Sequence, residues 1–166
     1  SRVGVMIRES SATGSRHMAA VAEKAGTARM IRRTTTSGSA SSSTTTILRP
    51  YWVRLRRVGS VFSAWASPDG STWTQTGANQ TIPMGLDVQA GLAVSARSDG
   101  LLSTAVFDNV TIDGLPATGL VGRTIGYVNA QGTDTLDAGA YTVIGSGASI
   151  GSTQDECHFV ATTLMG

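Results

Sequence analysis

The chain has 166 residues, of which 40% are hydrophobic and only 14% charged, with a formal net charge of +2. A chain of this length suits one domain that buries about two-thirds of its surface on folding, so the core can be stable without a disulfide cross-link. The single cysteine, Cys157, excludes an internal disulfide, and no apolar run approaches the roughly 18 residues that a membrane-spanning helix requires.

The positive charge is concentrated in the first part of the chain. Residues 1–60 hold eleven Lys or Arg against two Glu, a net charge of +9, whereas residues 61–166 carry a net charge of −7. Such an imbalance could steer anionic partners to the protein, or let a basic face of one copy meet an acidic face of the next. The imbalance would cancel if antiparallel strands from the two halves lie side by side.

Short strand-like segments follow one another from the N-terminus, with Gly, Ser and Thr between them, which favours an all-β fold. The apolar run at 2–8 predicts a strand covered on both faces, and the segments 17–23 and 27–33 predict a hairpin. The Ser/Thr/Gly segment 34–46 is expected to be a long surface loop with partial strand character.

The stretch 50–73 is the predicted organising centre, because it contains all three tryptophans. Its alternating residues predict a hairpin of 52–58 and 61–67, and a Pro68-Asp69-Gly70 turn leads from it to a further strand at 72–76. We expect Trp73, which follows this turn, to pack into the core or over the end of the hairpin.

The remainder of the chain contains two longer apolar runs and then weaker signals. The runs 88–96 and 101–112 predict another hairpin, joined across Ser98-Asp99-Gly100. We predict a main β-sandwich over residues 1–113, a Gly-rich connection over 114–140, and strands over 141–166 that belong to the same module or to the next.

Catalysis is not predicted. Glycoside hydrolysis by the common route needs two carboxylates about 5 to 10 Å apart, and no predicted strand carries acidic residues at positions i and i+2. His17 and His158 lack companions at metal-ligand spacing, so we expect both to be solvated or hydrogen-bonded strand residues. Cys157 precedes His158 directly, and neighbours in a strand point to opposite faces. We therefore expect no enzyme.

One face of the central hairpin is a candidate ligand-binding site. Alternation places Trp52, Arg54 and Arg56 on the same face, where an aromatic ring and guanidinium groups could hold an anionic sugar or a phosphate. Trp52 and Trp65 are candidate platforms for a sugar ring, with packing in the core as the alternative. The arginines could equally form a solvated strand face. The basic residues are Arg29, Arg32 and Arg33, followed by Arg49, Arg54, Arg56 and Arg57.

A nucleic-acid partner is not expected, because RNA-binding modules usually combine basic residues with more exposed aromatic side chains. No membrane span is expected either. The partners that fit the residues are an acidic or neutral glycan, or copies of the chain itself.

Six segments carry a family resemblance: GVMIRES (4–10), GSRH (14–17), RRTTT (32–36), the stretch 50–77, GLAVSARSDG (91–100) and AVFDNVTI (105–112). In order and spacing they resemble the concanavalin A-like lectin/glucanase β-sandwich modules, and among them a group of domains of unknown function. The resemblance implies a jelly-roll sandwich of two antiparallel sheets in an extracellular or cell-surface protein, with polysaccharide or surface glycan as partner and no assigned catalytic residues. Calcium is common in such sandwiches and could bind at turns such as Asp99 or 108–109; no other cofactor is expected.

The C-terminal segment 141–166 is similar to the beginning of such a module, so the order of the two pieces is reversed. The strand and loop that join them in the family are missing, and the chain opens without an initiating Met. The sequence therefore indicates a circularly permuted module, or the end of one repeat joined to the start of the next. In the second case, copies could donate strands head to tail and build a filament, sheath or surface layer. The two functional hypotheses are an adhesive or glycan-binding accessory module and a structural tandem repeat.

Overall fold

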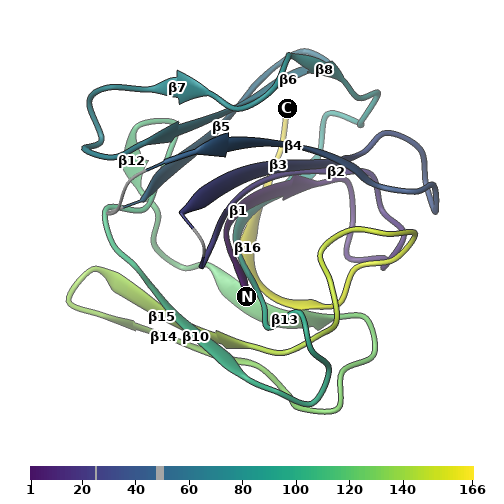
Figure 1. The fold of residues 1–166 in the computed structure, drawn as a ribbon, viewed down its shortest axis with the longest axis vertical. Coiled ribbons are helices and arrows are strands. Elements are labelled where there is room, and N and C mark those ends of the chain that lie inside the picture. Colours follow the sequence, from purple (N-terminus) through teal and green to yellow (C-terminus); the bar gives the residue numbers. More distant parts are fainter. Residues whose placement is uncertain (25, 48–50) are drawn as a thin grey trace.

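The computed structural model describes residues 1–24, 26–47 and 51–166, which form strands, turns and loops (Figure 1). Residues 25 and 48–50 lie outside the described residues, and with them part of the turn predicted at 24–26 and Arg49. The prediction of an all-β chain is confirmed. No helix in the described part of the chain is long and apolar enough to cross a membrane.

A curved seven-stranded antiparallel sheet forms the centre of the molecule and appears as an arch in Figure 1. At its centre the N-terminal strand pairs with a strand from the second half of the chain, so segments far apart in sequence lie side by side. In spatial order the strands are β13 (Val121–Ile125), β16 (Cys157–Leu164), β9 (Val88–Ser95), β1 (Arg2–Arg8), β2 (His17–Glu23), β3 (Thr27–Arg33) and β4 (Ser41–Thr46).

Two smaller antiparallel sheets cover the outer side of the arch. One packs on β1 and β2, and the other packs on β9 and β16. The first contains β5 (Trp52–Val58), β6 (Val61–Ser67), β7 (Thr74–Gln75) and β8 (Gln80–Thr81), and the second contains β10 (Ser103–Phe107), β15 (Ala140–Gly145) and β14 (Thr133–Asp137). A short separate hairpin is made by β11 (Thr111–Ile112) and β12 (Leu115–Pro116).

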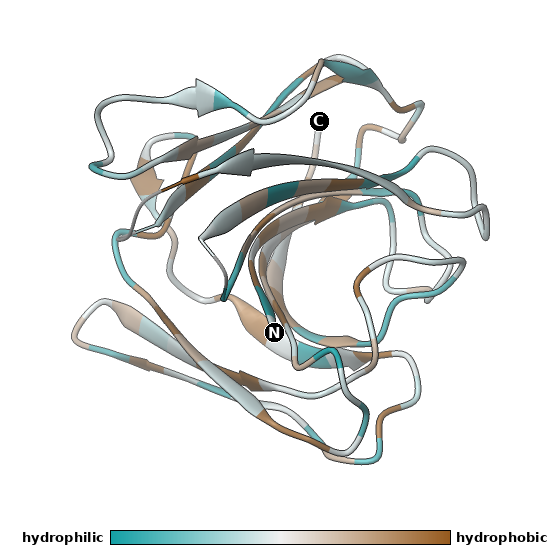
Figure 2. Cartoon of the chain, in the orientation of Figure 1, coloured by the Kyte–Doolittle hydropathy of each residue, from teal (hydrophilic) through white to brown (hydrophobic). Residues whose placement is uncertain are grey.

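The core lies on both sides of the large sheet. On the outer side, Met18 and Ala20 of β2 pack against Phe62 of β6. On the inner side of the arch, the loop between β15 and β16 inserts Ile150, which is fully buried against Met6 and Phe159. Because both faces of the sheet are covered, β2 is buried along nearly its whole length. Hydrophobic segments lie along many of the strands, while hydrophilic residues occur both on strands and in loops (Figure 2).

Local predictions near the N-terminus are confirmed. The hairpin 17–33 forms with the predicted bounds, and so does the hairpin 52–67. The segment 34–46 ends in β4, an edge strand of Ser and Thr residues.

The hairpin predicted from 88–96 and 101–112 is wrong, because β9 and β10 belong to different sheets. β9 pairs with β1 and β16, whereas β10 pairs with β15. The turn between them, in which Arg97 and Gly100 both have positive φ angles of 61° and 80°, carries the chain from one layer to the other. Each of these two strands therefore pairs with segments far along the chain, and the two do not pair with each other.

The last third of the chain contributes to the same sheets as the first two. The region 114–140, predicted as a connection, supplies β12, β13 and β14. In the segment 141–166, β15 pairs with β10 and β16 lies between β9 and β13.

Candidate functional site

The four predicted ligand-binding residues lie on one surface, the outer face of the β5–β6 hairpin. Arg54 is directly opposite Trp65, and Arg56 and Trp52 are opposite serines of β6. The intervening residues of β5, Val53 and Leu55, point inward and pack against the core. The alternation of the sequence therefore determines which side chains reach solvent.

A fifth residue, Trp73, joins this surface. Trp65 pairs with Gln75 of β7, and Trp73 lies two residues before Gln75, on the same side of the sheet. Core packing, which was one expectation for Trp73, is wrong, since the side chain is only partly buried. We call the surface made by Trp52, Arg54, Arg56, Trp65 and Trp73 the Trp/Arg face.

Arg54 is held over two indole rings. Its guanidinium carbon lies 4.2 Å from the ring centroid of Trp73 and 5.6 Å from that of Trp65. Both distances fall within the range of cation–π attraction, which is worth about 0.5 to 1 kcal/mol at an exposed site. The two contacts restrain the position of the Arg54 guanidinium.

Hydrogen bonds fix the two rings that contact Arg54. The indole nitrogen of Trp65 donates to the hydroxyl of Ser63 at 3.0 Å, and that of Trp73 donates to the carbonyl oxygen of Gly70 at 3.1 Å. Both rings are partly exposed, and their indole N–H groups are already hydrogen-bonded within the protein.

Trp52 lies against the turn at Gly70. A Cβ atom added at Gly70 would lie 3.0 Å from two atoms of its ring, so the turn at Gly70 covers part of the indole. Gly70 also has φ of +76°, a conformation that favours glycine. Trp52 therefore supports the turn that carries Trp73.

Asp69 rigidifies the same turn. Its carboxylate accepts hydrogen bonds from the backbone N–H of Thr72 at 2.7 Å and of Ser71 at 2.8 Å, and from the hydroxyl of Ser67 at 2.9 Å. These bonds, the one from Thr72 first, hold the pKa of Asp69 well below its usual range. This side-chain capping explains how so exposed a turn can present Trp73 in one orientation.

The arginines of the Trp/Arg face have no anionic partner within the described ranges. Arg54 and Arg56 are exposed, and no described carboxylate lies within ion-pair distance of either. Arg57, on the opposite face of β5, donates instead to the carbonyl oxygens of Gly59, Met84 and Gly85. The face thus combines apolar rings with two uncompensated positive charges.

Comparisons with protein-family models, with curated proteins and with solved structures find no match to this chain. The Trp/Arg face is therefore interpreted from its own geometry.

A second cluster of charged residues is fully buried inside the arch. Arg8, His17 and Arg33 are direct neighbours across β1, β2 and β3, and Asp155 from the β15–β16 loop lies against all three. Arg33 holds the Asp155 carboxylate with two hydrogen bonds of 2.8 and 2.9 Å. The same carboxylate lies 3.3 Å from Nδ1 of His17 and 3.4 Å from Arg8.

This cluster is structural, because no part of it reaches solvent. Burial by itself would raise the pKa of Asp155, but the hydrogen bond and charge of His17, together with Arg33 and Arg8, hold that pKa well below its usual range. Arg33 therefore does not belong to an exposed basic cluster with Arg29 and Arg32. Sequence reasoning missed the cluster because its members come from four segments separated by up to 147 positions in the chain.

The remaining candidates for chemistry are occupied or inaccessible. Nε2 of His158 lies 2.8 Å from a carboxylate oxygen of Asp134, which makes a hydrogen-bonded strand histidine. Burial raises the pKa of Cys157 to about 12, so the thiol stays protonated at neutral pH. Asp99, a candidate calcium ligand, accepts hydrogen bonds from Asn129. Within the described residues, no three His, Cys, Asp or Glu side chains gather as a metal site.

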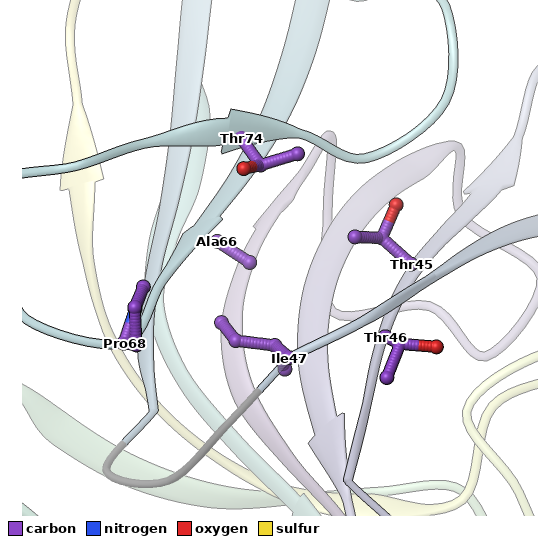
Figure 3. A pocket seen from close by; sticks show the side chains of 6 residues that line it. All are labelled: Thr45, Thr46, Ile47, Ala66, Pro68 and Thr74. Atoms are coloured by element: carbon purple, nitrogen blue, oxygen red, sulfur yellow. The ribbon is translucent and has the colours of Figure 1, made fainter.

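An open cavity of about 210 Å³ lies on the other side of β6 and β7 from the Trp/Arg face (Figure 3). It separates β4 from β6 and β7, and its walls carry hydroxyl and methyl groups without a titratable side chain. Among the described residues, the cavity therefore offers no charged group to a ligand. Its lining residues are Thr45, Thr46, Ile47, Ala66, Pro68 and Thr74.

Proposed function

We propose that the protein is a non-catalytic glycan-binding module of an extracellular or cell-surface protein, with a concanavalin A-like jelly-roll fold, and that its Trp/Arg face binds an acidic glycan. The observation that carries the proposal is Arg54, stacked 4.2 Å from the Trp73 ring with no described anionic partner. A carboxylate, sulfate or phosphate group of a sugar would supply that partner.

The chemistry of the face fits an acidic sugar better than a neutral one. Arginine presents its donors in a planar fork that pairs with carboxylate or phosphate oxygens through two hydrogen bonds. The exposed parts of the Trp65 and Trp73 rings offer apolar surface on which the C–H groups of a sugar ring can stack. Because Arg54 already lies over both rings, a ligand can contact the guanidinium edge and the neighbouring indole surface together.

The absence of an acid–base pair on this face supports binding without turnover. Asp69 is the carboxylate next to Trp73, and its oxygens are used by the turn. The Trp/Arg face therefore has no pair of carboxylates with which to cleave a glycosidic bond by the common route.

A screen against polysaccharides of matched backbone, in acidic and neutral forms, tests the proposal. The wild-type protein should retain acidic polymers, and Trp65→Ala and Trp73→Ala should each reduce retention. Tyr127→Ala is the matched control, because Tyr127 is 78% exposed and lies on another part of the surface. Equal retention of neutral and acidic polymers, or equal losses in all three variants, would contradict the proposal.

A further inference from the structure

The surface that carries the Trp/Arg face continues across β6 to β7. Arg54 of β5 is directly opposite Trp65 of β6, and on the other side of β6 Trp65 is directly opposite Gln75 of β7. Residues that are directly opposite each other in an antiparallel pair share one face of the sheet, so these three side chains form a row on the outer face. Neighbouring strands lie about 4.8 Å apart, so the row extends over roughly 10 Å.

A second row lies beside the first. Arg56 of β5 is directly opposite Ser63 of β6. On the other side of β6, the register of β8 continued by one residue places Asn79 beside Ser63. The side chain of Asn79 lies close to the first row, because it accepts a hydrogen bond of 2.8 Å from Gln75. Each row therefore has an arginine on the β5 side of β6 and an amide on the other side.

The two amides leave one donor and one acceptor for a ligand. Nε2 of Gln75 donates to Oδ1 of Asn79, and within the described part of the chain Oε1 of Gln75 and Nδ2 of Asn79 have no hydrogen-bond partner. Exchanging oxygen and nitrogen in both amides would reverse the two roles and still leave one donor and one acceptor. Gln75 is half-buried and Asn79 is exposed. A fixed donor beside a fixed acceptor suits two neighbouring hydroxyl groups, because a hydroxyl both donates and accepts.

We propose that this part of the Trp/Arg face, together with Gln75 and Asn79, selects hexuronate units of a glycan. The inference rests on the proposed function and names the class of acidic sugar. A hexuronate ring carries its carboxyl group on one edge and a pair of neighbouring secondary hydroxyls on the opposite edge. The surface has the same division, with uncompensated cations on one side of β6 and the amide pair on the other.

Each group of a hexuronate then has a partner. The carboxylate pairs with Arg54 or Arg56, neither of which has a described carboxylate within ion-pair distance. The hydroxyl pair binds the two amides, and the ring lies between them over the exposed part of Trp65. A neutral sugar leaves the arginines without an anion. A sulfated or phosphorylated sugar that lacks the free hydroxyl pair leaves the amides without a partner.

Chemical modification of one oligosaccharide tests the two sides of the site separately. The probe is a galacturonate oligomer, and its affinity is measured by isothermal titration calorimetry. Methyl esterification removes the negative charge and keeps the hydroxyl pair, whereas periodate cleaves the bond between the two hydroxyl-bearing carbons and keeps the carboxylate. Each treatment should weaken binding about fivefold or more. Equal affinity for the untreated and the periodate-treated oligomers would overturn the inference.

Variants of the amide pair assign the effect to these residues. Gln75→Ala and Asn79→Ala should each weaken binding of the untreated oligomer about fivefold and leave binding of the periodate-treated oligomer within about twofold of the wild type. Gln154→Ala is the matched control, because Gln154 is an exposed glutamine in the loop between β15 and β16, and it should change neither affinity. Equal losses for both oligomers in the amide variants would show that the amides do not contact the hydroxyl pair.

A sulfated glucan, which is acidic but contains no uronate, separates failure of this inference from failure of the proposed function. The wild type should bind the galacturonate oligomer more tightly than a sulfated glucan oligomer of equal charge. Equal binding of the two, with no effect of Gln75→Ala, would contradict the hexuronate assignment and leave an acidic-glycan site in place. Binding of neither oligomer would contradict both proposals.

Discussion

Replacing Asp155 by Asn tests the view that the buried charges hold the arch together. The variant keeps the shape of the side chain but removes the one carboxylate among the described residues that contacts Arg8 and Arg33, both of them fully buried. Breaking a buried ion pair from one side costs about 3 to 5 kcal/mol, because the remaining charge has lost its partner without regaining water. A domain is stable by only about 5 to 15 kcal/mol, so the loss is a large fraction of the whole.

The assay is urea denaturation at neutral and at acidic pH, with Asp137→Asn, at an exposed position at the end of β14, as the control. The control should change the free energy of unfolding by less than about 0.5 kcal/mol. The pKa of Asp155 is lowered in the folded protein, so its contribution is fully present above the unfolded-state pKa of about 3.9 and is lost as the pH falls through the folded-state pKa. The variant should therefore lose less stability in acid than the wild type. A cost below about 1 kcal/mol at neutral pH, or an unchanged acid dependence, would refute the reasoning.

Two further predictions concern the turn and the thiol. Gly70→Ala should lower the free energy of unfolding by more than Gly59→Ala does. Both glycines have positive φ, but only a methyl group at Gly70 would meet the Trp52 ring, at 3.0 Å. Equal losses of stability in thermal melts of the two variants would show that the ring does not restrain the turn. Cys157 should resist a thiol reagent such as Ellman's reagent at pH 8 in the native protein and react fully in denaturant, because the folded-state pKa is raised to about 12 by burial. Rapid labelling of the native protein would place the thiol outside the core.

Those parts of the fold and of the site that depend on neighbours in sequence could be predicted. The alternation in β5 placed Trp52, Arg54 and Arg56 on one face, and the predicted pairing of β2 with β3 and of β5 with β6 is confirmed. In each case the information lies within about fifteen residues, where strand period and turn chemistry decide the outcome.

Features that depend on distant pairing could not be predicted. Trp73 reaches Arg54 only because β7 pairs with β6 in a particular register, which no local pattern specifies. Asp155 meets Arg33 across 122 positions of sequence, and no local pattern predicts that contact. β9 likewise pairs with the distant strands β1 and β16 and not with β10, and no local pattern predicts that choice.

The most direct test of the proposed function is the affinity of Arg54→Ala for an acidic polysaccharide retained by the wild type, measured by isothermal titration calorimetry. A charge-assisted hydrogen bond is worth about 1.5 to 3 kcal/mol, which corresponds to a loss of roughly tenfold or more. Arg123→Ala removes the same charge from an exposed position on β13 and should leave the affinity within about twofold at equal ionic strength. A tenfold loss confined to Arg54→Ala is the predicted result, and equal affinities of the two variants would contradict the assignment of the Trp/Arg face as the glycan site.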